Sequence, residues 1–180
     1  MGKLLSPKPV KLFLGMISRE PELFTECTRL FAEEFGPVDL VSNVLPWEHS
    51  EYYREEMGTG LLRMFIFFEP PADPELLAAV KHHAIRIESS FSDTASGAGR
   101  RRINLDPGYL TEAKVVLATT KDFPHRIYIG KSIYAESTLH YHKDSRSFRP
   151  VGHTYPDFRT EYCLKLFNGA RDTLRSRLGR

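Results

Sequence analysis

The strand-like segment 133–141 and the segment 121–128 before it are rich in ionisable side chains. Because successive side chains of a strand point to opposite faces, Tyr134 and Glu136 share the polar face of 133–141. Glu136 and His125 are residue types that transfer protons near neutral pH. We predict that both are catalytic and that Tyr134 contacts a ligand. The solvated face of an ordinary antiparallel sheet has the same pattern, so a purely structural role stays open as the alternative.

Gly130-Lys131-Ser132 lies between these segments and predicts a hairpin turn, which would place Arg126 opposite Glu136. It does not predict a phosphate-binding loop. That loop requires G-x-x-x-x-G-K-[ST] between a strand and a helix, so that backbone N–H groups surround the phosphates. Here His125 stands at the position of the first glycine, and strand-like residues follow the turn. We therefore expect no selectivity for GTP over other polyanions.

A second group of polar residues lies in segment 100–109. Asn104 and Asp106 alternate out of a predicted strand, and Pro107-Gly108 predicts a turn that would hold both side chains at the strand end. We predict that Asp106 is catalytic and that Asn104 binds a ligand. The alternative is that Asp106 only caps the turn by accepting hydrogen bonds from backbone N–H groups.

Arg63 interrupts the otherwise apolar segment 61–68. A buried charge is costly unless it is paired or reaches a polar pocket, and Glu136 is its expected partner. Guanidinium groups suit phosphate oxygens, so we predict one cleft that binds a small anionic, phosphate- or nucleotide-like ligand. The predicted ligand-binding side chains of this cleft are Arg63, Asn104, Lys121, Arg126, Tyr134, Asp157 and Arg159.

A metal site is a weaker interpretation. His140 and His142 share a strand face and would need Glu136 or Asp106 as a further ligand. The H-x-H pattern is common at strand ends, and neither a cysteine nor a second histidine pair accompanies it, so we assign no metal site. No motif identifies a cofactor, and the sequence leaves open whether the chain is an enzyme.

Apolar periodicity predicts the elements that must position these residues. The predicted strands are 10–17, 38–45, 61–68, 101–105, 114–120, 126–129 and 133–141. The predicted helices are 21–35, a helix that begins after Asp73 and extends to Phe91, and 156–178. Residues 47–60 are expected to form a short helix or a long loop, and residues 92–99 a flexible loop.

The order of elements through residue 105 is β-α-β-β-α-β, which is the split βαβ arrangement of ferredoxin-like folds. The expected fold class is therefore α+β, with a ferredoxin-like βαββαβ first half that a hairpin-rich β region and a C-terminal helix extend. Residues 1–180 contain no linker long enough to divide them, and we expect a single domain.

The composition indicates a folded protein: 41% of the 180 residues are hydrophobic and 27% are charged, which excludes disorder and collagen, and no apolar run spans a membrane. Residues 1–99 carry 9 basic and 15 acidic side chains, whereas residues 100–180 carry 16 basic and 8 acidic ones. Cys27 and Cys163 lie in apolar helical patterns and predict buried, reduced thiols. We expect a cytoplasmic protein.

Three functions compete. The first is binding of a small anionic ligand, with or without catalysis. The second is a non-enzymatic interaction or scaffold protein whose charged residues form structural ion-pair networks. The third, less favoured, is RNA binding through base stacking on Tyr109, Tyr128 and Tyr134. We expect no membrane partner and a monomer or weak homodimer.

Several segments together resemble the bacterial and archaeal family of unknown function DUF4416. They are EYYREEMG (51–58), Leu62-Arg63-x-Phe65, RINLDPGYL (102–110), residues 114–141 and TYPDFRT (154–160). Some members carry the label "GTP-binding protein", which the His125 substitution and the lack of an N-K-x-D motif do not support here. The resemblance implies a single-domain extent and no mechanism. The motif residues that it implies are Tyr52, Tyr53, Glu56, Arg63, Asn104, Asp106, Tyr109, Lys121, His125, Arg126, Tyr134, Glu136, Tyr155, Asp157 and Arg159.

Overall fold

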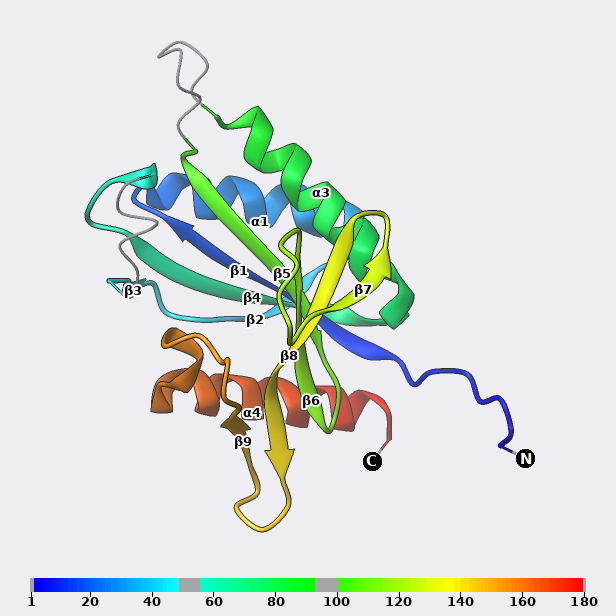
Figure 1. Cartoon of the computed structure of the whole chain (residues 1–180). Helices are drawn as coiled ribbons and strands as arrows, with labels where there is room; N and C mark the ends of the chain where they lie inside the picture. The colour runs from blue at the N-terminus through cyan, green and yellow to red at the C-terminus, as the bar shows by residue number, and fades with distance from the viewer. Residues whose placement is uncertain (1, 49–55, 93–100, 180) are drawn as a thin grey trace.

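The computed structural model describes residues 2–48, 56–92 and 101–179 (Figure 1). Half of the segment 47–60, expected to be a short helix or long loop, and nearly all of the expected flexible loop at 92–99 lie outside these described residues. The strands are β1 (Val10–Ser18), β2 (Val38–Val41), β3 (Leu45–Pro46), β4 (Leu62–Ala72), β5 (Ile103–Leu110), β6 (Lys114–Thr119), β7 (Ile127–Gly130), β8 (Ile133–His142) and β9 (Ser147–Pro150). The helices are α1 (Pro21–Phe35), α3 (Leu77–Ser90), α4 (Glu161–Arg177) and the 3₁₀ turns η1 (Pro74–Leu76) and η2 (Asp157–Arg159).

The strands form one antiparallel sheet in the order β2-β4-β1-β5-β6-β8-β7, and β3 and β9 pair with β4 and β8. Helices α1 and α3 cover one face of this sheet, and α4 packs on the other (Figure 1). The predicted α+β class is therefore confirmed. Within the described ranges, no helix has both the length and the apolar character that a membrane span needs.

Strand β1 lies in the centre of this arrangement because both of its faces are apolar. Leu12, Leu14 and Met16 pack into the cluster under α1 and α3, whereas Phe13 packs into the cluster under α4. All four are at most 2% exposed. A strand covered on both faces reads as a continuous apolar run, which is how residues 10–17 were recognisable.

Strands β5 and β6 separate along their length, and this separation creates room inside the fold. They pair only from Gly108 to Leu110 of β5 with Val115 to Leu117 of β6, while β5 pairs with β1 from Ile103 to Leu110. The predicted turn at Pro107-Gly108 is therefore wrong, because both residues lie within β5. Gly108 is needed where the strands are closest, since a Cβ there would lie 2.4 Å from the Val116 carbonyl oxygen.

The predicted hairpin turn between β7 and β8 is confirmed. Gly130 pairs with Ile133, so Lys131 and Ser132 form a two-residue connection. Their φ angles of 53° and 59° are those of a type I′ turn. Because the turn joins two strands, it presents no helix N-terminus to a phosphate group.

The predicted C-terminal helix divides into two parts. Residues Asp157–Arg159 form η2, and α4 begins after Thr160, whose hydroxyl accepts a hydrogen bond from the Cys163 N–H at 3.2 Å. The bend between them places Phe158 in the core under α4 and directs Asp157 toward β4. Strand β9, which the sequence analysis did not predict, pairs with β8 and packs against α4.

Candidate functional site

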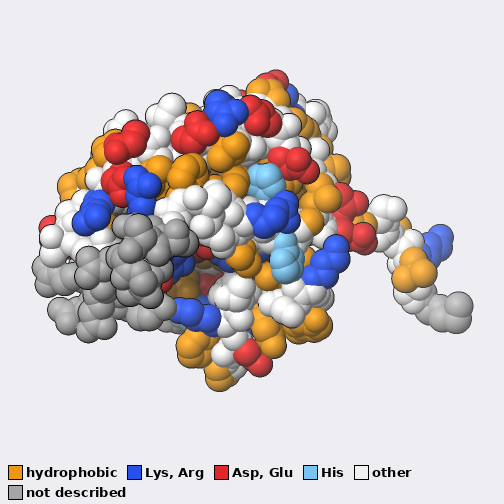
Figure 2. Space-filling model, turned by 90° about the horizontal axis from the view of Figure 1, so that it is seen from above, with side chains coloured by type: hydrophobic (Ala, Val, Ile, Leu, Met, Phe, Trp, Pro, Cys, Tyr) orange, Lys and Arg blue, Asp and Glu red, His pale blue; other side chains and the backbone are white. Residues whose placement is uncertain are grey.

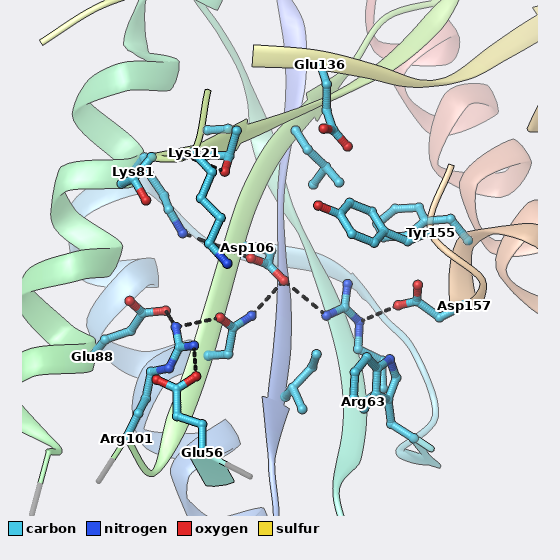
Figure 3. Close-up of a pocket in the computed structure, with 18 of the residues that line it drawn as sticks. Glu56, Arg63, Lys81, Glu88, Arg101, Asp106, Lys121, Glu136, Tyr155 and Asp157 are labelled. Carbon is cyan, nitrogen blue, oxygen red and sulfur yellow. Dashed lines mark hydrogen bonds and ion pairs between the residues drawn. The ribbon is translucent and has the colours of Figure 1, made fainter. Parts of the chain in front are cut away.

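A cavity of about 460 Å³ lies where β5 and β6 separate. Its walls come from β4, β5, β6, β8, α3, η2 and the segment after β6 (Figure 3). In the space-filling view, basic and acidic side chains are visible in a hollow beside the grey residues (Figure 2). The charged residues of the described chain that line it are Glu56, Arg63, Lys81, Glu88, Arg101, Asp106, Lys121, Glu136 and Asp157.

Arg63 reaches this cavity from β4 by crossing the adjacent strand β1. Its Nη1 lies 3.3 Å from Asp106 Oδ2 on β5, and its Nε lies 3.3 Å from Asp157 Oδ2 on η2. The crossing passes over Gly15, which pairs with Asp106 and has no side chain to block the guanidinium group. The expected pairing of Arg63 with Glu136 is therefore wrong. Two other carboxylates are closer, because only β1 separates β4 from β5, whereas β1, β5 and β6 separate β4 from β8.

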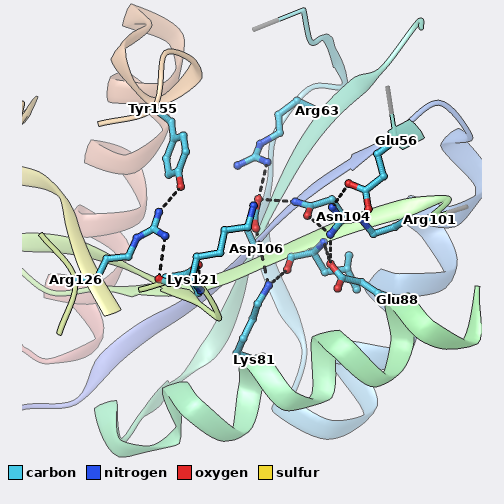
Figure 4. Close-up of polar contacts among 12 residues, drawn as sticks. Glu56, Arg63, Lys81, Glu88, Arg101, Asn104, Asp106, Lys121, Arg126 and Tyr155 are labelled. Carbon is cyan, nitrogen blue, oxygen red and sulfur yellow. Dashed lines mark hydrogen bonds and ion pairs between the residues drawn. The ribbon is translucent and has the colours of Figure 1, made fainter. Parts of the chain in front are cut away.

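Asp106 is the junction of the polar network. It accepts a hydrogen bond from Asn104 Nδ2 at 2.7 Å, contacts Arg63, and lies 4.0 Å from the Lys81 ammonium group (Figure 4). Its side chain is 27% exposed, so part of the carboxylate faces the open cavity. Lys121, from the segment after β6, extends toward the same junction (Figure 3).

Helix α3 forms the second wall through Lys81 and Glu88, which are seven residues apart and so lie on one side of the helix. Lys81 Nζ donates to the Leu105 carbonyl at 2.7 Å, and Glu88 Oε1 accepts from the Leu105 N–H at 2.6 Å. Burial raises the pKa of Glu88 above its usual value, against the opposing effects of Lys81 and the Leu105 N–H.

Arg101 joins this wall to the rest of the network. It donates to Asn104 Oδ1 at 2.8 Å and to Glu56 Oε2 at 2.6 Å, and it lies 3.8 Å from Glu88 (Figure 4). A continuous series of polar contacts thus runs from Glu56 through Arg101, Asn104 and Asp106 to Arg63.

Strand β8 supplies the third wall through Glu136, whose side chain is 1% exposed. Its Oε2 accepts from Arg126 Nε at 2.7 Å and lies 3.2 Å from His125 Nε2. The predicted placement of Arg126 opposite Glu136 is therefore confirmed. Within the described part of the chain, the second oxygen, Oε1, accepts no hydrogen bond although it is buried.

Tyr155 closes the cavity beside Glu136. Its hydroxyl accepts a hydrogen bond from Arg126 Nη2 at 2.8 Å (Figure 4). Burial raises the pKa of this phenol, and the nearby Glu136 carboxylate raises it further. Tyr155 therefore carries its proton at neutral pH.

The structure brings most of the predicted site residues to one place. Six of them line the cavity, and they are Arg63, Asn104, Asp106, Lys121, Glu136 and Asp157. His125 and Arg126 contact Glu136 without lining the cavity themselves.

Two predicted ligand-binding residues lie elsewhere. Tyr134 packs against Tyr128 with ring centroids 5.4 Å apart. Arg159 donates to the backbone carbonyls of Val151, Gly152 and Thr154 and so ties the chain before η2 together. Alternation and composition could not separate these residues from the cavity group, because all are polar residues near strand or helix ends.

Lys81 and Glu88 are the cavity residues that the sequence analysis missed. Each follows a core residue of α3 by four positions, Leu77 and Ala84 respectively. They therefore interrupt the buried stripe of the helix, and that interruption was the available signal. Among the described residues, no three His, Cys, Asp or Glu side chains gather so as to hold a metal ion, and His140 instead contacts the Ser137 hydroxyl.

The match to a family model covers residues 8–174 of the chain, and the family is described as a domain of unknown function, DUF4416. The chain therefore belongs to the DUF4416 family. No curated protein and no solved structure matches it.

Proposed function

We propose that the chain binds a small anionic, phosphate- or nucleotide-like ligand in the cavity between β5 and β6. The volume of about 460 Å³ lies within the range of small-molecule sites, roughly 300–1,000 Å³. Arg63, Lys81, Glu88 and Glu136 are each at most 9% exposed, yet they surround an open space instead of packing against one another. Burial of charged groups is costly, so a ligand that completes their contacts would justify it.

The observation that carries the proposal is the contrast with a second buried ion pair in the same chain. Lys11 Nζ lies 2.7 Å from both oxygens of Asp39 and 2.9 Å from the Phe68 carbonyl, away from the cavity. That cation has a complete set of short contacts. Around the cavity, the ion pairs of Arg63 and Lys81 measure 3.3 to 4.0 Å. Such loose geometry is typical of sites that tighten when a ligand binds.

The junction at Asp106 is where the anionic group would bind. Arg63 and Lys81 approach this single carboxylate from β4 and α3, and Lys121 extends toward it from a third direction (Figure 3). Two cations therefore pair with one carboxylate that is partly open to the cavity, and a third extends toward it. Guanidinium and ammonium groups together are the usual ligands of phosphate oxygens in proteins.

The alternative is a scaffold protein in which the same contacts are structural. RNA binding has less support, because helices cover both faces of the sheet and Tyr109 packs against the apolar clusters. We further propose that β1, α1, β2, β4, α3 and β5 form a ferredoxin-like unit, which the strand order β2-β4-β1-β5 supports. A cytoplasmic location stays a prediction, to which the free, buried thiols are suited.

Calorimetric titration of the full chain with pyrophosphate tests the proposal. Lys81→Met should weaken binding at least ~10-fold, since a hydrogen bond to a charged group is worth about 1.5–3 kcal/mol. Lys11→Met is the matched control: it should lower the melting temperature and leave binding unchanged. No binding by the wild type, or loss of thermal stability in Lys81→Met without a change in affinity, would favour the scaffold alternative.

We expect the same titration to show no preference for GTP over ATP. The turn at Lys131 and Ser132 joins two strands and offers no phosphate-binding loop. GTP should therefore bind within about threefold of ATP, which corresponds to less than about 0.7 kcal/mol. A clear preference for GTP over ATP would contradict this prediction.

A further inference from the structure

We infer that Glu136 and Tyr155 recognise a hydroxyl group, so that the ligand of the cavity is a phosphorylated polyol such as a sugar phosphate. The inference rests on the proposed function, because it adds a second recognition point to the anion site at Asp106. It is carried by two groups on one wall of the cavity, Glu136 and Tyr155, and by Arg126 behind them, which contacts both.

Arg126 holds the other two side chains next to each other. Its Nε donates to Glu136 Oε2 at 2.7 Å, and its Nη2 donates to the Tyr155 hydroxyl at 2.8 Å. Donors of one planar guanidinium group have a fixed separation, so the carboxylate and the phenol are presented side by side. Both face the cavity (Figure 3).

Each of these two groups has one unused hydrogen-bonding position. Within the described residues, Glu136 Oε1 is buried without a donor. The Tyr155 oxygen accepts from Arg126, so its own proton is directed elsewhere, and no described residue accepts it. A buried acceptor without a donor thus lies beside the phenol, and leaving a buried polar group such as Glu136 Oε1 unpaired costs about 1–3 kcal/mol. Tyr155 itself is 44% exposed, so its proton is accessible to a ligand.

A hydroxyl group fits this pair better than an ammonium group. The charge of Glu136 is already balanced by Arg126 at 2.7 Å, and His125 lies 3.2 Å away. A second cation would therefore meet little net negative charge. A neutral hydroxyl can donate to Glu136 Oε1 and accept from Tyr155 at the same time, as both unused positions require.

The hydroxyl site and the anion site belong to the same cavity. Asp106 lies in the middle of the residues drawn in Figure 3, Arg63 and Lys81 approach it from different directions, and Glu136 and Tyr155 lie together beside it. A ligand with a phosphate at one end and hydroxyl groups at the other would contact both.

The test compares probes that differ only in their hydroxyl groups. Glycerol 3-phosphate and n-propyl phosphate share a phosphate and a three-carbon chain, and ribose 5-phosphate extends the series. Calorimetric titration of the full chain should show at least one polyol phosphate binding ~10-fold more tightly than propyl phosphate, as expected for one charge-assisted hydrogen bond.

Two variants locate the effect. Tyr155→Phe removes the donor. Glu136→Gln places an amide NH₂ at the unused position, because Arg126 requires the amide oxygen. Each should reduce the preference for the polyol phosphate over propyl phosphate to less than about threefold. Tyr128→Phe and Glu20→Gln, which alter a tyrosine and an arginine-paired glutamate outside the cavity, should have no effect.

The outcomes distinguish the two proposals. Equal binding of propyl and polyol phosphates, or a preference that survives in Tyr155→Phe, would overturn the hydroxyl inference and leave the anion site intact. Failure of every phosphate probe to bind would overturn both. If Glu136→Gln does not fold, Tyr155→Phe decides the question, because loss of one hydroxyl leaves the Glu136–Arg126 pair in place.

Discussion

Gly15 determines which carboxylates Arg63 can reach. It lies in β1 between Arg63 on β4 and Asp106 on β5, and it pairs with both Phe65 and Asp106. A side chain at this position would occupy the space through which the guanidinium group crosses. One glycine in a buried strand thus connects the two sides of the cavity.

Gly15→Ala should disturb this crossing. The new Cβ would lie 2.7 Å from Arg63 Nη2 and 3.0 Å from Phe65 Cε1, so the guanidinium group must move away from Asp106. We expect a loss of about 1–3 kcal/mol in the free energy of unfolding, as for other overpacked cores, together with weaker anion binding.

Gly169→Ala in α4 is the control for this variant. Apart from the adjacent residues and the nearby backbone of α4, no described atom lies within 4 Å of a Cβ at that position, and alanine favours a helix, so stability should rise by roughly 0.5–1 kcal/mol. Urea denaturation measures both variants. An unchanged free energy of unfolding in Gly15→Ala would show that Arg63 does not need the space over Gly15.

Glu88 makes stability depend on pH in a predictable direction. Burial is the main cause that raises its pKa in the folded protein above the ordinary value of 4.5. A raised folded pKa means that the folded state holds this proton more tightly than the unfolded state does. The resulting stability is fully present below pH 4.5 and is lost as the pH rises through the folded pKa.

Glu88→Gln should remove this dependence, because the amide does not ionise. The difference in free energy of unfolding, variant minus wild type, should increase as the pH rises above about 4.5. It should become constant once the pH exceeds the folded pKa of Glu88. Urea denaturation between pH 4 and 8 measures the difference. Glu34→Gln, at an exposed position of α1, is the control. It removes the same charge without a buried group, so it should not produce this pH dependence. A difference that does not change with pH would refute the prediction.

At the scale of elements, the separation of β5 from β6 forms the cavity, and the β7–β8 hairpin positions its far wall. The register of that hairpin places Arg126, just before β7, next to Glu136 on β8. Lys131 and Ser132 both adopt positive φ in the turn, which costs non-glycine residues roughly 1–2 kcal/mol each. The turn therefore retains its geometry against local backbone preference.

Replacing Lys131-Ser132 by Asn-Gly should stabilise the protein. Asn-Gly is the preferred sequence of a type I′ turn. The substitution keeps the hydrogen bond from His82, because its acceptor is the backbone carbonyl of Lys131. We expect the free energy of unfolding to rise by roughly 0.5–1 kcal/mol, less than the full strain because glycine also loses more entropy on folding. A lower melting temperature would argue against a type I′ turn.

At the scale of the whole molecule, two apolar clusters lie on opposite faces of the sheet, and each contains one cysteine. Cys27 of α1 belongs to the cluster under α1 and α3, and Cys163 of α4 to the other. The predicted free and buried state of both thiols is confirmed. Burial raises the pKa of Cys27 to about 12 and also raises that of Cys163.

Neither thiol should react with Ellman's reagent in the native protein, because a raised pKa and burial suppress the reactive thiolate. Both should react once the chain unfolds in denaturant without reductant. Reaction of one thiol at a denaturant concentration where the other is protected would show that the two layers open separately. Rapid reaction of either thiol in the native state would contradict the observed packing.

Local pattern was sufficient for most of the elements. The apolar runs of β1 and β4, the stripes of α1, α3 and α4, and the turn before β8 are properties of neighbouring residues, and the sequence alone predicted each of them. It also placed Arg126 opposite Glu136, a register that the turn and the adjacent register shift between Tyr128 and Gly130 set together. Strand β9, with four residues, was too short for its pattern to show.

The arrangement of the cavity required the tertiary structure. Arg63 pairs with Asp106 and Asp157, which are 43 and 94 positions away, only because β1 lies between β4 and β5 and carries a glycine at the crossing. Pro107-Gly108 has the composition of a turn but lies within β5, where pairing with β1 overrides the local preference. Lys81 and Glu88 face a void that exists only because β5 and β6 separate. Sequence pattern predicts which side chains are buried or polar, whereas strand order and register decide which of them meet.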